Sequence, residues 1–264
     1  PDMVLLADGK PVIVDTTFEQ NFKISPEQLE VAITPRTRLL VLNSPSNPTG
    51  QTYTKAELAA LGEVLRKHPE VLVASDDMYE HILWADEPFA NIVTVCPDLY
   101  DRSIVLNGVS KAYSMTGWRI GYAAGPESLI KAMKKIQSQS TSNPTSIAQV
   151  AAQAALEGDQ GCIQTMLKTF KERHDMVVEG LNKIDGLECL PSSGTFYAFP
   201  RVEGLIERLE GIENDMQLAE HLIEQLGLAL VPGSAFGCDG YMRLSYATST
   251  ENLQEALKRL SAVK

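Results

Sequence analysis

Residues 39–50 read LLVLNSPSNPTG, an apolar run of four residues followed directly by a turn of Asn, Ser, Pro, Thr and Gly. The same order recurs at 71–81 (VLVASDDMYEH) and at 103–111 (SIVLNGVSK). Short apolar runs bounded by turn residues are typical of buried strands. Longer helical patterns separate these runs, so the connections are predicted to be crossovers and the sheet mostly parallel. We therefore predict an α/β fold.

Two more apolar runs extend this pattern. PVIVDTT at 11–17 and RIGYAA at 119–124 are both predicted to be strands. Helix starts lie between the strands, because Ser25 and Thr54 are each followed three residues later by Gln or Glu, the spacing of a capping box. The predicted helices are one that starts at Pro26, one over 55–68, two within 127–157 that are interrupted near 142–144, and a long one from about 162 to 184.

The pattern changes after residue 186. The predicted elements are then a strand at 187–200, a helix at 215–226, strands at 228–231 and 241–246, and a helix at 250–263. This order suggests a small α+β domain. We predict that residues 1–184 form a large domain together with the long connecting helix. Residues 185–264 are predicted to form a smaller C-terminal domain.

Composition is that of an ordinary globular protein, with 44% apolar and 22% charged residues and no apolar run long enough to span a bilayer. The formal net charge of −11 argues against binding to nucleic acid or to an anionic membrane surface and favours a small-molecule ligand. The cysteines have neither the spacing of a metal site nor the density of a disulfide scaffold. We therefore expect free thiols, no metal, and a reducing, cytoplasmic compartment.

Polar residues follow the predicted strands at the ends that form the ligand crevice of open parallel sheets. Asn47 lies in the turn after the first run, which by composition alone is an ordinary Pro/Gly turn. Asp76 and Tyr79 follow the second run. A lone acid at this place is more often a helix N-cap, and the other interpretation is a buried partner for a cation.

Ser110 and Lys111 follow the third run in a loop of small residues. Most of the 13 lysines must be surface groups, but burial at a strand end would lower the pKa of Lys111 and make it a nucleophile toward an aldehyde. Arg119 taken alone is a strand-edge arginine. Arg243 alternates with apolar neighbours, so it should point away from them and needs an anionic partner.

Four of these elements form an ordered set. They are the Asn47-Pro-Thr-Gly loop, the Asp76-x-x-Tyr element, Ser110-Lys followed by Thr116-Gly-Trp-Arg-Ile-Gly-Tyr, and Arg243 within Tyr-x-Arg-Leu-Ser-Tyr. In this order they resemble the class I aminotransferases of pyridoxal 5'-phosphate (PLP) fold type I, and most of all a bacterial subgroup described as aspartate aminotransferases. One such motif is a weak signal, whereas four ordered elements leave little room for chance.

The resemblance implies a role for each residue around PLP. Lys111 would form the internal aldimine and then carry the proton between the substrate α-carbon and the cofactor. Asp76 would pair with the pyridinium nitrogen and keep it protonated. Asn47 and Tyr79 would hydrogen-bond the phenolic oxygen of the cofactor.

The same resemblance assigns the anionic groups of cofactor and substrate. Arg119, helped by Ser110, would hold the phosphate, and Arg243 would bind the substrate α-carboxylate beside Asn47. The implied activity is transamination between an L-amino acid and a 2-oxo acid in amino-acid metabolism, by a homodimer. Two alternatives stay open: other PLP chemistry such as β-elimination or a synthase reaction, and an aminotransferase-like sensor domain in a transcription regulator.

The opening residues, PDMVLL, read as the middle of a fold, so we expect the stretch to be N-terminally incomplete. The resemblance implies that the preceding part carries a phosphate-binding loop, an aromatic residue that stacks on the cofactor ring, and residues that recognise the substrate side chain. The identity of the amino acid is therefore not predicted. We also expect residues 1–264 alone to be inactive.

Several other residues are given structural roles. Asp77 is interpreted as helix-start chemistry, and His81 as a surface or interface histidine. For residues 138–143, a position facing the active site of a partner subunit and a simple helix break are equally favoured. The remaining histidines, His68, His174 and His221, are expected to be structural. The segments 194–197 and 231–236 are expected to be fold and cleft-wall elements.

Overall fold

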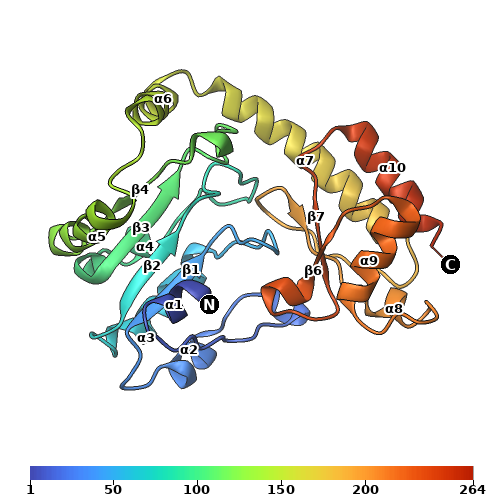
Figure 1. Cartoon of the computed structure of the whole chain (residues 1–264). Helices are drawn as coiled ribbons and strands as arrows, with labels where there is room; N and C mark the ends of the chain where they lie inside the picture. The colour runs from blue at the N-terminus through green and yellow to red at the C-terminus, as the bar shows by residue number, and fades with distance from the viewer. Residues whose placement is uncertain (264) are drawn as a thin grey trace.

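A computed structural model describes residues 1–263 of the chain. Figure 1 shows a larger sheet built by the first half of the chain and a smaller one beside the C-terminal helices. The larger sheet has the order β1 (Leu39–Asn43), β2 (Leu72–Asp76), β3 (Ser103–Gly108) and β4 (Gly121–Ala124). The first three strands are parallel and β4 is antiparallel to β3, so the predicted mostly parallel α/β sheet is confirmed.

Helices surround both sheets. Those of the first part are α1 (Asp2–Leu6), α2 (Pro26–Ala32), α3 (Lys55–Arg66), α4 (Ile92–Val95), α5 (Glu127–Ser140) and α6 (Ser146–Glu157). The long helix α7 (Gly161–Leu181) runs from the larger sheet to the smaller one (Figure 1), and α8 (Glu203–Ile206), α9 (Asp215–Leu226) and α10 (Thr250–Ser261) follow it. None of the helices in the described part of the chain is long and apolar enough to cross a membrane.

The predicted capping boxes open two of these helices. Ser25 accepts a hydrogen bond from the backbone of Gln28, whose side chain binds back to Ser25 N–H. Thr54 and Glu57 form the same pair at the start of α3. Such a cap stabilises a helix by about 1 kcal/mol, because it satisfies N–H groups that have no partner within the helix.

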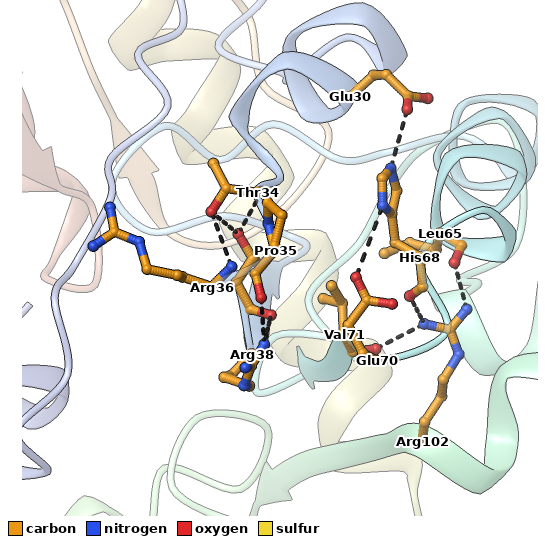
Figure 2. Close-up of polar contacts among 11 residues, drawn as sticks. Glu30, Thr34, Pro35, Arg36, Arg38, Leu65, His68, Glu70, Val71 and Arg102 are labelled. Atoms are coloured by element: carbon orange, nitrogen blue, oxygen red, sulfur yellow. Dashed lines mark hydrogen bonds and ion pairs between the residues drawn. The ribbon is translucent and has the colours of Figure 1, made fainter.

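The turn that joins α3 to β2 is fixed by Arg102, as Figure 2 shows. Its guanidinium donates to the carbonyl oxygens of Leu65 at 2.6 Å, His68 at 2.8 Å and Val71 at 2.7 Å. Leu65 lies in the last turn of α3, and His68 and Val71 lie in the connection to β2. Arg102 directly precedes β3, so this contact ties the starts of β2 and β3 together at the edge opposite the polar turns.

Two large apolar clusters hold most of the elements in place, beside a small aromatic cluster around Phe18, Phe199 and Tyr241. One lies between the larger sheet and helices α2 to α4, and the other surrounds α7 and the smaller sheet. Burying a leucine side chain stabilises the fold by about 1.5–3 kcal/mol. Fully buried leucines of the two clusters include Leu58, Leu61, Leu65, Leu181, Leu218 and Leu222.

The smaller sheet has the order β5 (Tyr197–Ala198), β7 (Met242–Ser245) and β6 (Val231–Pro232), with antiparallel pairing throughout. The strand predicted over 187–200 is therefore mostly wrong: only two of its residues join the sheet, and an isolated bridge joins Glu188 to Arg201. The segment between them turns instead, because its backbone binds other loops. The strand predicted at 228–231 likewise shifts to 231–232.

The strand predicted at 11–17 is also wrong. These residues adopt neither helix nor strand, and Val12 and Ile13 are 65% and 62% exposed. An apolar run becomes a strand only where a neighbour supplies backbone hydrogen bonds. Within residues 1–263 this run has no such neighbour.

Candidate active site

The site lies where the carboxyl ends of the parallel strands meet. Asn43 pairs with Asp76 in the β1–β2 register, and Asp76 pairs with Leu106 in the β2–β3 register. The three polar turns therefore begin at the same edge of the sheet. This is the edge at which ligands bind in open parallel sheets.

Lys111, three residues after β3, points toward aromatic rings. Its Nζ lies 5.8 Å from the ring centroids of both Tyr79 and Phe196. The pKa of Lys111 is lowered, first by burial and then by the positive charges of Arg243 and Arg119. Each of these factors disfavours the ammonium form, so a larger fraction of the side chain is a neutral amine that can attack an aldehyde.

Asp76, the last residue of β2, is a half-buried carboxylate. Its Oδ1 accepts a hydrogen bond from Met78 N–H at 3.2 Å, and burial raises its pKa. The helix-cap interpretation is wrong, because residues 78–81 form a turn that does not continue into a helix. Among the ion pairs of residues 1–263, none involves Asp76, so this carboxylate is available to a cationic group of a ligand.

Asp77 also differs from its predicted role at a helix start. Its side chain is 1% exposed and accepts hydrogen bonds from Ser75 Oγ and Asn91 Nδ2, both at 2.6 Å. Burial raises the pKa of Asp77 to about 6. Its backbone N–H donates to Leu106 O, so Asp77 fixes the end of β2 against β3 and against the start of α4.

Tyr79 meets a residue that the sequence analysis assigned only to the cleft wall. Its hydroxyl lies 3.0 Å from the hydroxyl of Tyr197, the first residue of β5. Burial, followed by this hydrogen bond, raises the pKa of Tyr79. Tyr79 therefore stays a neutral hydroxyl, which can donate to an oxygen of a ligand while accepting from Tyr197.

Arg243 lies in the centre of β7 with its apolar neighbours on the other face. As predicted from their alternation, Met242 and Leu244 are buried while Arg243 is partly exposed. Arg243 Nη1 donates to Asn47 Oδ1 at 2.8 Å. The guanidinium carbon lies 4.5 Å from the ring centroid of Tyr197 and 4.9 Å from that of Phe236. Its Nε is buried and has no hydrogen-bond partner within the described residues, which fits an anionic ligand.

The two residues predicted to hold a phosphate are placed less tightly. Arg119 follows the 3-10 helix η3 (Thr116–Trp118), is exposed, and donates Nη1 to Thr116 O at 2.9 Å. It is close enough to Lys111 to lower the pKa of that amine. Ser110 directly precedes Lys111 and is partly buried. Both residues therefore lie on the Lys111 side of the site.

The structure thus brings together the side chains of Asn47, Asp76, Tyr79, Lys111 and Arg243. This set fits PLP and an amino acid. An amine of lowered pKa suits an aldehyde, the carboxylate of Asp76 suits a protonated ring nitrogen, and the free Nε of Arg243 suits a carboxylate.

Sequence reasoning missed the roles of Tyr197, Phe196 and Phe236 in this site. They come from segments far from Lys111 along the chain, and only tertiary packing places their rings against Lys111 and Arg243. The segment Gly194-Thr-Phe-Tyr was expected only to be a fold and cleft-wall element. The available signal was the adjacent aromatic pair Phe196 and Tyr197 at the start of β5, the strand that pairs with the strand of Arg243.

Comparison with known proteins shows the family of the chain. Residues 1–260 match the family model described as aminotransferase class I and II. The chain is 58% identical over 268 aligned residues to an aspartate/prephenate aminotransferase of Nitrosomonas europaea, covering 100% of this chain and 68% of that protein. Other relatives are covered to 66%, so the chain spans about two thirds of the length of the curated relatives it matches.

Solved structures give the same picture. The aspartate aminotransferase from Rhizobium meliloti superposes with a TM-score of 0.95 at 47% identity, over 99% of this chain and 66% of that one. An aromatic aminotransferase from Pyrococcus horikoshii gives a TM-score of 0.91 at 36% identity, over 98% and 68%. These comparisons favour neither the alternative PLP chemistry nor the sensor domain. The expected aminotransferase fold and class are confirmed, and the chain belongs to the class I and II aminotransferase family.

Proposed function

We propose that the protein built on this chain transfers an amino group between an L-amino acid and a 2-oxo acid, with PLP as cofactor and Lys111 as the reacting amine. One observation carries the proposal. The lowered-pKa amine of Lys111 lies 5.8 Å from the ring of Tyr79, whose pKa is affected by the charges of both Asp76 and Arg243. Among residues 1–263, Asp76 forms no ion pair and Arg243 Nε has no hydrogen-bond partner. A carbonyl, a cation and an anion therefore each have a partner at one edge of the sheet.

PLP, when bound, supplies an aldehyde and a ring that can accept electrons from the substrate. Lys111 would take the proton from the substrate α-carbon and return it, because its neutral form is favoured by burial and by two nearby arginines. Asp76 would hold a proton at the ring nitrogen. Its partial burial strengthens that charge-assisted hydrogen bond relative to one made in water.

The substrate is oriented by Arg243. Its planar guanidinium is held between Tyr197 and Phe236 and by Asn47, so its orientation is set before the ligand arrives. A guanidinium fixed in this way can bind a carboxylate through two parallel hydrogen bonds. Both the amino acid and the 2-oxo acid carry that carboxylate, so the same contact would serve both directions of the transfer.

The remaining groups are assigned to the cofactor. Tyr79 would donate its hydroxyl hydrogen to the phenolic oxygen, with Asn47 beside it, and Ser110 and Arg119 would bind the phosphate. The support for Tyr79 is its neutral hydroxyl at the Lys111 side of the site. The support for Arg119 is its influence on the pKa of Lys111 and its exposed guanidinium.

We propose aspartate as the preferred amino donor. The support is the name of two relatives that are 58% and 53% identical, both aspartate/prephenate aminotransferases. A relative named aromatic aminotransferase at 36% identity makes an aromatic donor the natural comparison. Initial rates with aspartate, phenylalanine and alanine, each with 2-oxoglutarate and with prephenate as acceptors, and with glutamate and prephenate, test this choice.

We also propose a homodimer in the cytoplasm, built from subunits whose two domains divide near residue 184. Apolar side chains on α5 and α6 support a further contact, since Ile136, Ile147 and Val150 are 72%, 71% and 65% exposed. The separate sheets and the long helix α7 between them support the domain division (Figure 1). Sedimentation of the protein expressed from its complete gene, and limited proteolysis near residue 184, test these two statements.

The direct test of the function is turnover with a defined product. The protein expressed from its complete gene is incubated with PLP, aspartate and 2-oxoglutarate, and formation of glutamate is measured. Stoichiometric formation of glutamate and oxaloacetate supports transamination. Release of ammonia and fumarate, or formation of alanine and carbon dioxide, without glutamate would instead show elimination or decarboxylation chemistry and would refute the proposal.

A further inference from the structure

His174 is a buried histidine of α7 that none of the assignments above uses. It is 3% exposed, and its Nε2 accepts a hydrogen bond from the backbone N–H of Ser192 at 2.9 Å. Its Nδ1 lies 2.9 Å from Asp175 Oδ1. A backbone N–H can only donate, so Nε2 must be unprotonated and Nδ1 must carry the hydrogen. The contacts therefore require a neutral imidazole in a single tautomer.

Ser192 belongs to a loop, Pro191–Thr195, that we call the bridging loop. Trp84 donates its ring N–H to Ser192 O at 2.9 Å and its backbone N–H to Ser193 O at 2.8 Å. Further hydrogen bonds of the bridging loop run from Gln51 Nε2 to Pro191 O, from Gly194 N to Gly50 O, and from Thr195 N to Ile82 O. The loop thus holds two segments at once: the turn that carries Asn47 and the segment that carries Tyr79.

The contact between the bridging loop and the Asn47 turn leaves no free space. Gly50 has φ +69°, and a Cβ there would lie 2.6 Å from Ser192 Cβ and 2.9 Å from Gly194 O. A displacement of Ser192 is therefore transmitted to the turn. The same loop leads within two residues to Tyr197, which hydrogen-bonds Tyr79 and packs on Arg243.

We propose that His174, as a neutral imidazole, is a positioning residue for transamination: by accepting the Ser192 N–H it fixes the bridging loop and thereby sets Asn47, Tyr79 and Tyr197 around Lys111. This inference rests on the proposed function. His174 contacts neither substrate nor cofactor itself. It acts through the hydrogen bond between its Nε2 and the backbone N–H of Ser192, which ties the loop to α7.

The surroundings of His174 determine how its hydrogen bond with Ser192 depends on pH. Asp175 and Lys171 face it from its own helix, Tyr246 packs on it from the end of β7 with rings 6.1 Å apart, and Trp84 packs on it at 5.3 Å. Burial is the largest cause of its lowered pKa, with Asp175 acting in the opposite direction. The imidazole thus stays neutral to lower pH than an exposed histidine.

Protonation would place an N–H of the imidazolium against the N–H of Ser192. The hydrogen bond would be lost and the bridging loop released. Because the unfolded chain binds this proton more readily, the folded state loses stability from His174 as pH falls below about 6.5, the ordinary pKa of histidine. Substrate turnover should fall at lower pH still, where His174 of the folded enzyme takes up its proton.

The experiment compares three variants of the protein expressed from its complete gene. His174→Gln keeps an oxygen acceptor near the position of Nε2 but does not titrate, whereas His174→Leu removes the acceptor. His221→Gln, on α9, is the matched control. The ratio kcat/KM for aspartate is measured from about pH 5 to about pH 8. We expect the wild type and His221→Gln to lose activity on the acid side, His174→Gln to keep it, and His174→Leu to be roughly tenfold less active at every pH.

A second measurement does not depend on activity. Residues 1–264 contain two tryptophans, Trp84 and Trp118. A background in which Trp118 and any tryptophan outside these residues are replaced by Phe leaves Trp84, packed on His174, as the reporter. A protonated imidazole quenches an adjacent indole, so Trp84 fluorescence should titrate on the acid side and should stop titrating when His174→Gln is added.

The outcomes separate the two levels of the proposal. An acid limb unchanged in His174→Gln, or a His174→Leu enzyme with wild-type kcat and KM, would overturn the positioning role even if the fluorescence titrates. An unmodified protein that forms no glutamate at any pH would instead remove the proposed function and this inference with it. That case is recognised because His221→Gln would be equally inactive.

Discussion

Replacement of Arg243 by leucine tests the proposed carboxylate site, because leucine can occupy the space between Tyr197 and Phe236 but offers no charge. The guanidinium has one hydrogen bond to a protein partner, from Nη1 to Asn47 Oδ1, and a buried Nε without a partner in the described structure. A substrate carboxylate would complete its bonding. We expect kcat/KM to fall for both the amino acid and the 2-oxo acid.

The size of the effect follows from the contacts that are lost. A hydrogen bond to a charged group contributes about 1.5–3 kcal/mol, and a bidentate pair supplies two of them. The expected loss is about 3–5 kcal/mol, which corresponds to roughly a hundred- to several-thousand-fold in kcat/KM. Arg243→Lys keeps the charge but lacks the planar fork, so its loss should be intermediate.

Arg201 provides a matched control. Its guanidinium also stacks on an aromatic ring, 4.3 Å from the centroid of Phe18, but pairs with Glu19 and Glu188 instead of facing the site. Arg201→Leu should lower the melting temperature slightly and leave kcat/KM within a few-fold of wild type. Steady-state kinetics and the absorbance of bound PLP are measured for each variant. A loss below tenfold in Arg243→Leu, or an equal loss in Arg201→Leu, would refute the carboxylate assignment.

Three further predictions concern Lys111, Tyr197 and Asp77. Borohydride reduction in the presence of PLP should fix the cofactor to the peptide that contains Lys111 and not to that of a Lys111→Ala variant; mass spectrometry showing label on another lysine would end the assignment. Tyr197→Phe leaves the buried hydroxyl of Tyr79 without its partner at 3.0 Å, so kcat should fall roughly tenfold while PLP absorbance persists; an unchanged kcat would show that the hydroxyl pair is irrelevant. Asp77 has its pKa raised from 3.8 to about 6, so the stability that its protonated form provides is lost as pH rises through about 6. The free energy of unfolding of Asp77→Asn, measured in urea relative to wild type, should therefore rise by about 2–3 kcal/mol between about pH 4 and about pH 7. A difference that does not change with pH would contradict the burial argument.

Much of the architecture was readable from local pattern. The runs that became β1, β2 and β3 were recognisable because buried parallel strands are short and apolar, and their ends are marked by turn residues. Helix starts were readable at Ser25 and Thr54 because a capping box is made by residues three apart. Such features depend on neighbours along the chain, so no knowledge of the remaining structure is needed to predict them.

The prediction failed where a residue's state depends on a partner far away in the chain. Residues 11–17 have the composition of a strand, but a strand needs a second one to bond with. Asp77 was interpreted from its position before a turn, whereas Ser75 and Asn91 hold it in the interior. The segment 187–200 turns away from a sheet because its backbone groups bind Gly50 and Ile82.

The candidate site divides in the same way. The order of four motifs along the chain, through the resemblance to class I aminotransferases, singled out Lys111, Asp76 and Arg243 as candidates. Taken alone, Asp76 was interpreted as a helix cap, and Arg243 indicated only the need for an anionic partner. Local pattern could not show that Tyr197 bonds Tyr79 across 118 positions, or that Arg243 reaches Asn47 across 196. Such contacts are made only when α7 and the smaller sheet pack against the larger one. The burial of apolar surface that drives this packing is non-directional, so the local sequence does not show which distant side chains it will bring together.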